Sequence, residues 1–141
     1  MYLLDTNVVS ELRKAGSGKA DANVVAWAAG APVPSLFLSA ISVMELETGV
    51  LLIERRDPAQ GQVLRTWLER SVLPAFEDRI FPIDTAVARR CATLHVPDRR
   101  SDRDALIAAT ALVHGMTVVT RNVADFDAID VAVHNPWIEV D

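Results

Sequence analysis

Several features that mark other classes of protein are scarce or missing in this chain of 141 residues. A single cysteine, Cys91, cannot support an internal disulfide framework, and we expect it to be a small buried hydrophobic residue. No Gly/Ser-rich or proline-rich tract is long enough to be a linker, so we expect one domain over residues 1–141. Half of the residues are hydrophobic, which argues against intrinsic disorder.

Signals for membrane insertion and secretion are also missing. The longest apolar stretch, residues 36–53, carries Glu45 and Glu47 near its middle, where a charge is costly in a bilayer. The N-terminus shows no basic segment followed by a cleavage site of small residues. We therefore expect a cytoplasmic protein that has no contact with membranes.

Positive charge is in short supply, with 14 Lys and Arg against 19 Asp and Glu and a formal net charge of -5. This balance argues against a protein that coats nucleic acid by neutralising phosphates, which requires a basic face. A cluster of carboxylates can instead bind a divalent cation that then contacts phosphate. The charge therefore leaves a metal-dependent enzyme open.

Short apolar runs alternate with helical segments along the chain. We predict strands at residues 1–4, 36–38, 80–83, 117–120 and 131–133, and helices at 8–14, 21–29, 43–56, 58–71, 84–94 and 101–115. Pro82 places the third strand at an edge of the sheet or at a strand end. Such alternation implies right-handed βαβ crossovers, so the predicted fold class is α/β, with three α/β/α layers around a mainly parallel central sheet.

Four acidic residues stand at strand ends or in the first turns of helices that follow. They are Asp5, Glu45, Asp104 and Asp125. The carboxyl ends of parallel strands lie at one edge of a sheet, so these side chains are expected to meet there. Four neighbouring carboxylates need a cation to offset their repulsion. Oxygen ligands favour Mg²⁺ or Mn²⁺ over Zn²⁺, which would be expected to recruit His or Cys.

Taken singly, these acids also have a purely structural explanation. Ser42 with Glu45 and Ser101 with Asp104 fit the capping box of a helix N-terminus, and Asn122 with Asp125 is a looser version. Capping and metal binding are compatible, because the positive end of a helix favours an ionised carboxylate. The expected convergence of all four acids is therefore what favours the metal site.

Other polar residues flank the acids. The short side chains that fit either a turn or a supporting role around a metal are Thr6, Asn7, Thr120 and Asn122. Arg103 and Arg121 lie close to the acids in the sequence and are candidate contacts for substrate phosphates.

The motifs in this order resemble those of PIN domains. They are Leu3-Leu4-Asp5-Thr6-Asn7, Ser42-x-x-Glu45-Leu46, Asp104-Ala105-Leu106-Ile107-Ala108-Ala109-Thr110-Ala111, and Val119-Thr120-Arg121-Asn122 followed by Asp125-Phe126. With the closing Asn135-Pro136-Trp137, the chain resembles more narrowly the VapC toxins of the FitB-like branch. The resemblance implies a Mg²⁺- or Mn²⁺-dependent endoribonuclease of a type II toxin-antitoxin pair. It also implies an RNA substrate, a VapB/FitA-like antitoxin as partner, and a homodimer.

The family's four acids map onto Asp5, Glu45, Asp104 and Asp125, with Asp127 as an alternative to Asp125. Candidates for a dimer surface are Leu51, Leu52 and Trp67. Two other functions stay open at this point. One is a non-catalytic partner-binding α/β module in which the acids only cap helices. The other is a haloacid-dehalogenase-like phosphatase, although that family has an aspartate where this chain has Asn7.

Overall fold

The computed structural model describes residues 1–138, and a five-stranded parallel sheet lies at its centre. The strands are β1 (Tyr2–Leu4), β2 (Leu36–Ser39), β3 (Ile80–Phe81), β4 (Thr117–Val119) and β5 (Val133–His134). Their order across the sheet is β3-β2-β1-β4-β5, which makes β1 the central strand. Because every pair is parallel, all the strands end at the same edge of the sheet.

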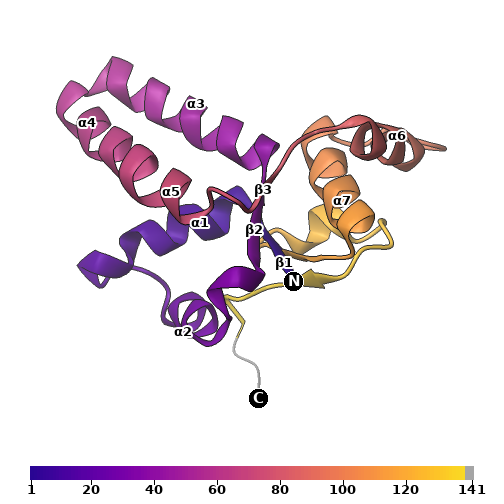
Figure 1. Cartoon of the computed structure of the whole chain (residues 1–141), viewed down its shortest axis with the longest axis horizontal. Coiled ribbons are helices and arrows are strands. Elements are labelled where there is room, and N and C mark those ends of the chain that lie inside the picture. The colour runs from indigo at the N-terminus through magenta and orange to yellow at the C-terminus, as the bar shows by residue number, and fades with distance from the viewer. Residues whose placement is uncertain (139–141) are drawn as a thin grey trace.

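The helices cover both faces of this sheet. They are α1 (Thr6–Arg13), α2 (Ala22–Gly30), α3 (Ala40–Arg56), α4 (Pro58–Trp67), α5 (Leu73–Ala75), α6 (Thr85–Leu94) and α7 (Asp102–His114). A π-helical turn, Leu68–Val72, joins α4 to α5, and single 3-10 turns cover Lys14–Ser17, Val33–Ser35 and Val123–Phe126. Helices α1 to α5 lie on one side of the sheet, and α6 and α7 on the other (Figure 1). Within residues 1–138, no helix has the length and apolarity needed to cross a bilayer.

The central strand is hydrophobic on both sides because both sides are covered. Leu4 packs with buried residues of α1, α2 and α3, whereas Leu3 packs with Ile107 and Ala108 of α7. Both leucines are almost completely buried. This is the expected pattern for an interior parallel strand, and the predicted three-layer α/β/α fold is confirmed.

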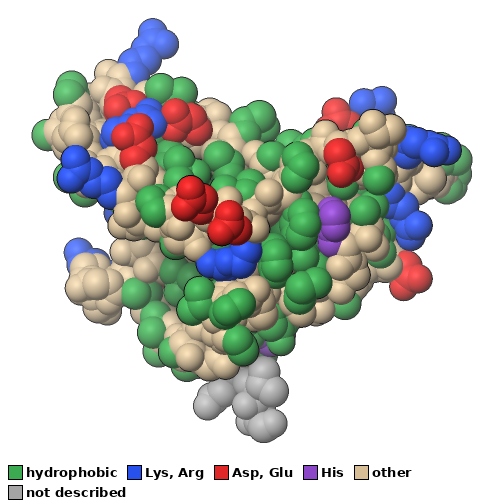
Figure 2. Space-filling model, viewed as in Figure 1, with side chains coloured by type: hydrophobic (Ala, Val, Ile, Leu, Met, Phe, Trp, Pro, Cys, Tyr) green, Lys and Arg blue, Asp and Glu red, His purple; other side chains and the backbone are tan. Residues whose placement is uncertain are grey.

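Helices α3 and α4 form a tightly packed antiparallel hairpin. Gly61 of α4 lies so close to α3 that a Cβ atom built on it would be 2.5 Å from the Cα of Glu54. Arg65 of α4 bonds to Glu47 and Glu54 of α3, with nitrogen-oxygen distances of 2.7 Å and 2.8 Å. Figure 2 shows acidic and basic side chains side by side over this hairpin. The missing side chain of Gly61 thus permits the close contact, and the ion pairs fix it.

Two predicted details at element ends are wrong. Helix α3 begins at Ala40, not near Val43, because Ser39 caps it by accepting a hydrogen bond from the N–H of Ile41 at 3.1 Å. Ser42 is consequently buried inside the helix and does not cap it, and Glu45 falls in the second turn. The predicted capping by Asn122 is also absent, since its side chain makes no capping bond to the turn that follows.

The last strand begins two residues later and ends one residue later than predicted. Residues 131–133 were expected in the sheet, but β5 spans Val133–His134 and pairs with Val118 and Val119 of β4. Val131 is apolar for another reason: it packs against the core cluster that contains Phe126 and Ile129. Its backbone N–H donates to the Ile129 carbonyl in a turn. A buried loop residue and a strand residue are both apolar, so the sequence pattern does not distinguish them.

Candidate active site

Asp5 lies at the carboxyl end of the central strand, and its side chain is fully buried. Its backbone N–H donates to the Val119 carbonyl at 2.9 Å and so extends the pairing of β1 with β4. One carboxylate oxygen, Oδ1, caps α1 by accepting from the N–H of Thr6 at 2.7 Å. The other, Oδ2, accepts from the hydroxyl of Thr120 at 2.8 Å. A buried carboxylate is costly unless it is bonded, and these donors hold Asp5 in one orientation.

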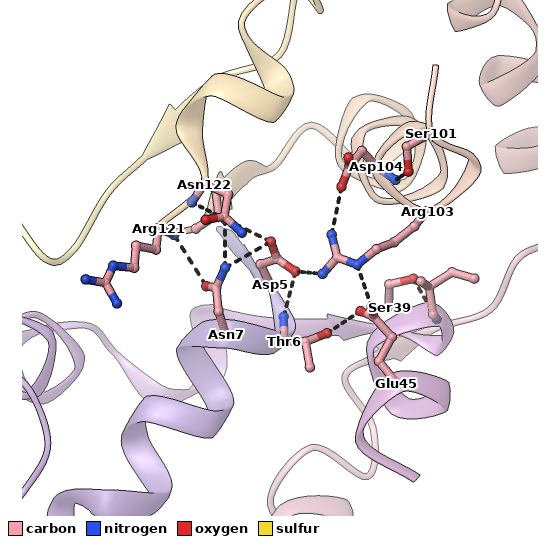
Figure 3. A network of polar contacts seen from close by, with 12 residues as sticks. Asp5, Thr6, Asn7, Ser39, Glu45, Ser101, Arg103, Asp104, Arg121 and Asn122 are labelled. Atoms are coloured by element: carbon pink, nitrogen blue, oxygen red, sulfur yellow. Dashed lines mark hydrogen bonds and ion pairs between the residues drawn. The ribbon is translucent and has the colours of Figure 1, made fainter. Parts of the chain in front are cut away.

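Three of the four predicted acids converge on one cation, the guanidinium of Arg103 (Figure 3). Its Nε donates to Oε2 of Glu45 at 2.5 Å, and one terminal nitrogen donates to Oδ1 of Asp104 at 2.7 Å. The second terminal nitrogen bonds to Oδ1 of Asp5. Each nitrogen of the guanidinium therefore contacts a different carboxylate.

These carboxylates change the electrostatic environment of Arg103. Burial lowers the pKa of its guanidinium, but the hydrogen bond to Glu45 and the negative charge of Asp5 outweigh that effect, and the pKa lies above its ordinary value. Arg103 also lies in the first turn of α7, where the helix dipole disfavours a positive charge. The three acids thus offset an unfavourable position for a cation.

The second and third acids come from different helices. Glu45 lies on α3, and its Oε1 accepts from the hydroxyl of Thr6 at 2.6 Å. Asp104 lies in the first turn of α7, and its backbone N–H is 3.5 Å from the Oγ of Ser101, the N-cap that the sequence predicted. Asp5 directly follows β1, Glu45 lies on α3 and Asp104 on α7, and only the tertiary fold makes these elements neighbours.

The predicted supporting residues surround Asp5 in the structure. The amide of Asn7 donates to the hydroxyl oxygen of Thr120 at 3.2 Å and lies 3.5 Å from Oδ2 of Asp5. The same hydroxyl oxygen accepts from the backbone N–H of Asn122 at 3.0 Å. Thr120 is fully buried, so its single proton is directed to Asp5 by the donors around it. Asn122 takes part through its backbone, whereas its side chain is exposed.

The fourth predicted acid does not join the cluster. Asp125 and its alternative Asp127 are both exposed on or beside the 3-10 turn after β4. Neither carboxylate forms a hydrogen bond or ion pair with any residue in the described range 1–138. Arg121 also points elsewhere, because its guanidinium lies 5.4 Å from the ring centre of Trp137. The structure thus brings together three acids and Arg103. Asp125, Asp127 and Arg121 lie outside this cluster on the exposed segment after β4, which we call the rim of the site.

The cluster fits a divalent cation in its chemistry, although Arg103 lies where such an ion would bind. As they stand, no three acidic, histidine or cysteine side chains among residues 1–138 are grouped tightly enough to share an ion. Carboxylates bonded to one guanidinium are, however, within roughly 8 Å of each other. Three carboxylates and one guanidinium carry a formal charge of -2 in sum. An oxygen-only donor set with this excess charge suits Mg²⁺ or Mn²⁺.

A groove of about 390 Å³ opens beside the cluster. It begins at Thr6 and Glu45 and runs between α1, α3 and α4. Arg13 and Arg56 supply positive charge along it, and Trp67 supplies an aromatic wall. Of the three clustered acids, Glu45 lines this groove.

Sequence reasoning missed the role of Arg103, which it assigned only to substrate binding. A signal was available, since an arginine in the first turn of a helix is opposed by the helix dipole and calls for nearby acids. It also missed Ser39, because Ser42 offered a better capping pattern three residues before an acid.

Comparison with known proteins agrees with this arrangement. The PIN domain family profile matches residues 2–132. This chain belongs to the PIN domain family. "Toxin FitB" of Neisseria gonorrhoeae is 41% identical over 97% of this chain and 99% of its own length. "VapC ribonuclease Y4jK" of Sinorhizobium fredii is 38% identical over 97% of this chain and 98% of its own length.

Solved structures that resemble this PIN domain include toxins in complex with their antitoxins. A crystal structure of FitAcB from Neisseria gonorrhoeae contains a chain that is 41% identical, with a TM-score of 0.88 over 97% of this chain and 99% of that one. A toxin-antitoxin complex from Klebsiella pneumoniae contains a chain that is 27% identical, with a TM-score of 0.70 over 96% and 98%. The resemblance to PIN domains and to their FitB and VapC members, noted from the motifs, is confirmed.

Proposed function

We propose that this PIN domain, acting as one unit over residues 1–141, is a Mg²⁺- or Mn²⁺-dependent endoribonuclease and the toxin of a type II toxin-antitoxin pair. The observation that carries the proposal is the convergence of Asp5, Glu45 and Asp104 from three separate elements on one cationic group. The names of the relatives supply the substrate class, since one is a VapC ribonuclease and another is toxin FitB. Such an enzyme would act on RNA in the cytoplasm.

In this proposal Asp5, Glu45 and Asp104 hold the metal, and Asp125 or Asp127 completes the set from the rim. A bound Mg²⁺ or Mn²⁺ would supply a water of lowered pKa and stabilise charge on a phosphodiester. The chain's own residues prepare the ligands. Thr120 and the backbone N–H of Thr6 fix the two oxygens of Asp5, while the hydroxyl of Thr6 orients Glu45. Asn7 and Asn122 in turn hold Thr120.

The substrate would approach along the groove that begins at Glu45. Arg13 and Arg56 lie in that groove and carry the charge that a phosphate backbone requires. Arg121, which extends over Trp137 at the rim, is a further candidate contact. We keep Arg103 as a candidate for substrate binding only after it has left the carboxylates.

The decisive experiment compares RNA cleavage by wild type, Asp104→Asn and Asp98→Asn. Within residues 1–138 the Asp104 carboxylate accepts one hydrogen bond, from Arg103, so its substitution should abolish cleavage while the fold is kept. Asp98 is exposed in the loop before α7 and serves as the matched control, with activity expected to equal wild type. Asp5→Asn should also be inactive, but its buried bonds make it the less clean variant. Full activity of Asp104→Asn, or cleavage that persists in excess EDTA, would contradict the proposal.

The fourth ligand can be assigned with the same assay. Asp125→Asn and Asp127→Asn are compared singly, because both residues are exposed and neither is bonded to the cluster. The substitution that lowers cleavage identifies the ligand, and the other serves as its control. If both variants keep full activity, three acids suffice.

We further propose an antitoxin of the VapB/FitA type and a homodimer as the assembly. The support for the antitoxin is the likeness to a toxin-antitoxin complex at 27% identity and a TM-score of 0.70. Leu51 and Leu52 on α3 are exposed and are candidates for the dimer surface. Light scattering of the isolated chain tests the dimer, and co-expression with a short reading frame found next to the gene would test the antitoxin.

The main alternative is a non-catalytic partner-binding module. It draws on the bonds that Asp5 and Ser101 make as helix N-caps, which would explain an acid at position 5 without any metal. A phosphatase of the haloacid-dehalogenase type is less well supported, because Asn7 replaces the second acid and its amide is directed toward Thr120. Hydrolysis of a phosphomonoester in the absence of RNA cleavage would favour the phosphatase.

A further inference from the structure

Arg103 lies among the three clustered carboxylates and bonds to each of them. The side chain of Arg103 is about one-third exposed, whereas the side chain of Asp5 is fully buried and that of Asp104 is mostly buried. All three of its contacts are to acids, and all three acids are predicted metal ligands. In the described part of the chain, no other cation contacts any of the three.

The geometry leaves little room for Arg103 and a metal to bind together. Oδ1 of Asp5 accepts from the backbone N–H of Thr6 and from Arg103, and Oδ2 accepts from the hydroxyl of Thr120, so Arg103 takes the remaining lone pair of Oδ1. A hard cation needs the lone pairs of that oxygen and repels the guanidinium charge at short range. Arg103 reaches the cluster through a flexible side chain from the first turn of α7, so it can turn outward to solvent without any change of the helix.

From this we propose that Arg103 is a built-in counter-ion that exchanges with the metal. In the metal-free protein it neutralises and holds together Asp5, Glu45 and Asp104, and it must leave the cluster before a divalent cation can bind. The inference rests on the proposed metal site. Arg103 then competes with the metal for the same carboxylates, and this competition lowers the apparent affinity of the site for metal.

The experiment measures two quantities for wild type, Arg103→Gln, Arg103→Lys and Arg99→Gln, without reference to RNA cleavage. The first is the melting temperature in excess chelator, and the second is the affinity for Mn²⁺ alone by titration calorimetry. Arg99 is the matched control, because it lies near the same helix start, is highly exposed, and among residues 1–138 pairs only with Asp102, at 3.3 Å. It should differ from wild type in neither quantity.

Arg103→Gln should lower the metal-free melting temperature by on the order of 5 °C, because three carboxylates lose their counter-ion. It should also tighten Mn²⁺ binding by about tenfold or more, since the binding-competent fraction rises when the competitor is removed. Arg103→Lys should fall between the two, because a lysine ammonium cannot contact three acids as a planar fork does. Saturating Mn²⁺ should return Arg103→Gln to the melting temperature of metal-bound wild type.

The outcomes separate this inference from the proposed function. If Mn²⁺ binds wild type and Arg103→Gln equally well, or binds Arg103→Gln more weakly, the counter-ion role is overturned even though the metal site stands. If neither protein binds Mn²⁺, both proposals fail. If only Arg103→Gln binds Mn²⁺ measurably, the counter-ion role is supported in its strongest form.

Discussion

Gly61 is the glycine at which an added methyl group should have the largest effect on packing. An added Cβ would lie 2.5 Å from the Cα and 2.6 Å from the Cγ of Glu54. Carbon atoms in contact are ordinarily about 3.5–4.0 Å apart, so α3 and α4 would have to separate by about 1 Å. The nearest atom belongs to the backbone of α3, so a change of rotamer cannot relieve the overlap.

The expected size of the effect follows from two opposing terms. Overpacking of a tight interface costs about 1–3 kcal/mol, and alanine is about 1 kcal/mol more favourable than glycine inside a helix. We therefore expect Gly61→Ala to lower the free energy of unfolding by up to about 2 kcal/mol. Gly49 on α3 has no atom within 4 Å of an added Cβ. Gly49→Ala should accordingly raise the free energy of unfolding by about 0.5–1 kcal/mol.

The assay is urea unfolding followed by circular dichroism on wild type and the two variants. Since both variants make the same chemical change in the same hairpin, the opposite signs isolate the close approach at Gly61. Equal m-values would establish that the transitions are comparable. If Gly61→Ala were as stable as Gly49→Ala, the inferred contact between α3 and α4 would be wrong.

Two further predictions concern titratable groups. The hydrogen bond from Arg65 lowers the pKa of Glu54 below its ordinary 4.5, so the contribution of Glu54 to stability is complete above pH 4.5 and is lost as the pH falls further. The difference in melting temperature between wild type and Glu54→Gln should therefore shrink in acid. A constant difference down to pH 3 would contradict this. Burial, aided by the charge of Asp102, raises the pKa of the Cys91 thiol. Alkylation of the native protein by iodoacetamide at pH 7 should therefore be far slower than alkylation of the urea-unfolded protein. Equal rates would show that the thiol is accessible.

Much of the fold was readable from the sequence because local rules and the tertiary structure agree there. The apolar run of β1 is buried on both faces, and the cap by Ser101 and the end of α7 at Gly115, with a φ of 66°, follow residue preferences that act over a few positions. The errors have a common cause, because the same local sequence pattern is compatible with more than one structure. Ser42 suited a cap but is buried, and Val131 suited a strand but packs from a turn.

The sequence by itself determined the fold class, the PIN-like order of motifs and the acids that stand near strand ends, because each depends on the type and spacing of neighbouring residues. Only the tertiary structure decided which acids meet. Asp5, Glu45 and Asp104 are joined through Arg103, while Asp125 stays at the rim. Contacts between β1, α3 and α7 depend on how three elements pack over one sheet edge, and no local pattern specifies the rotamer that places a guanidinium among three carboxylates.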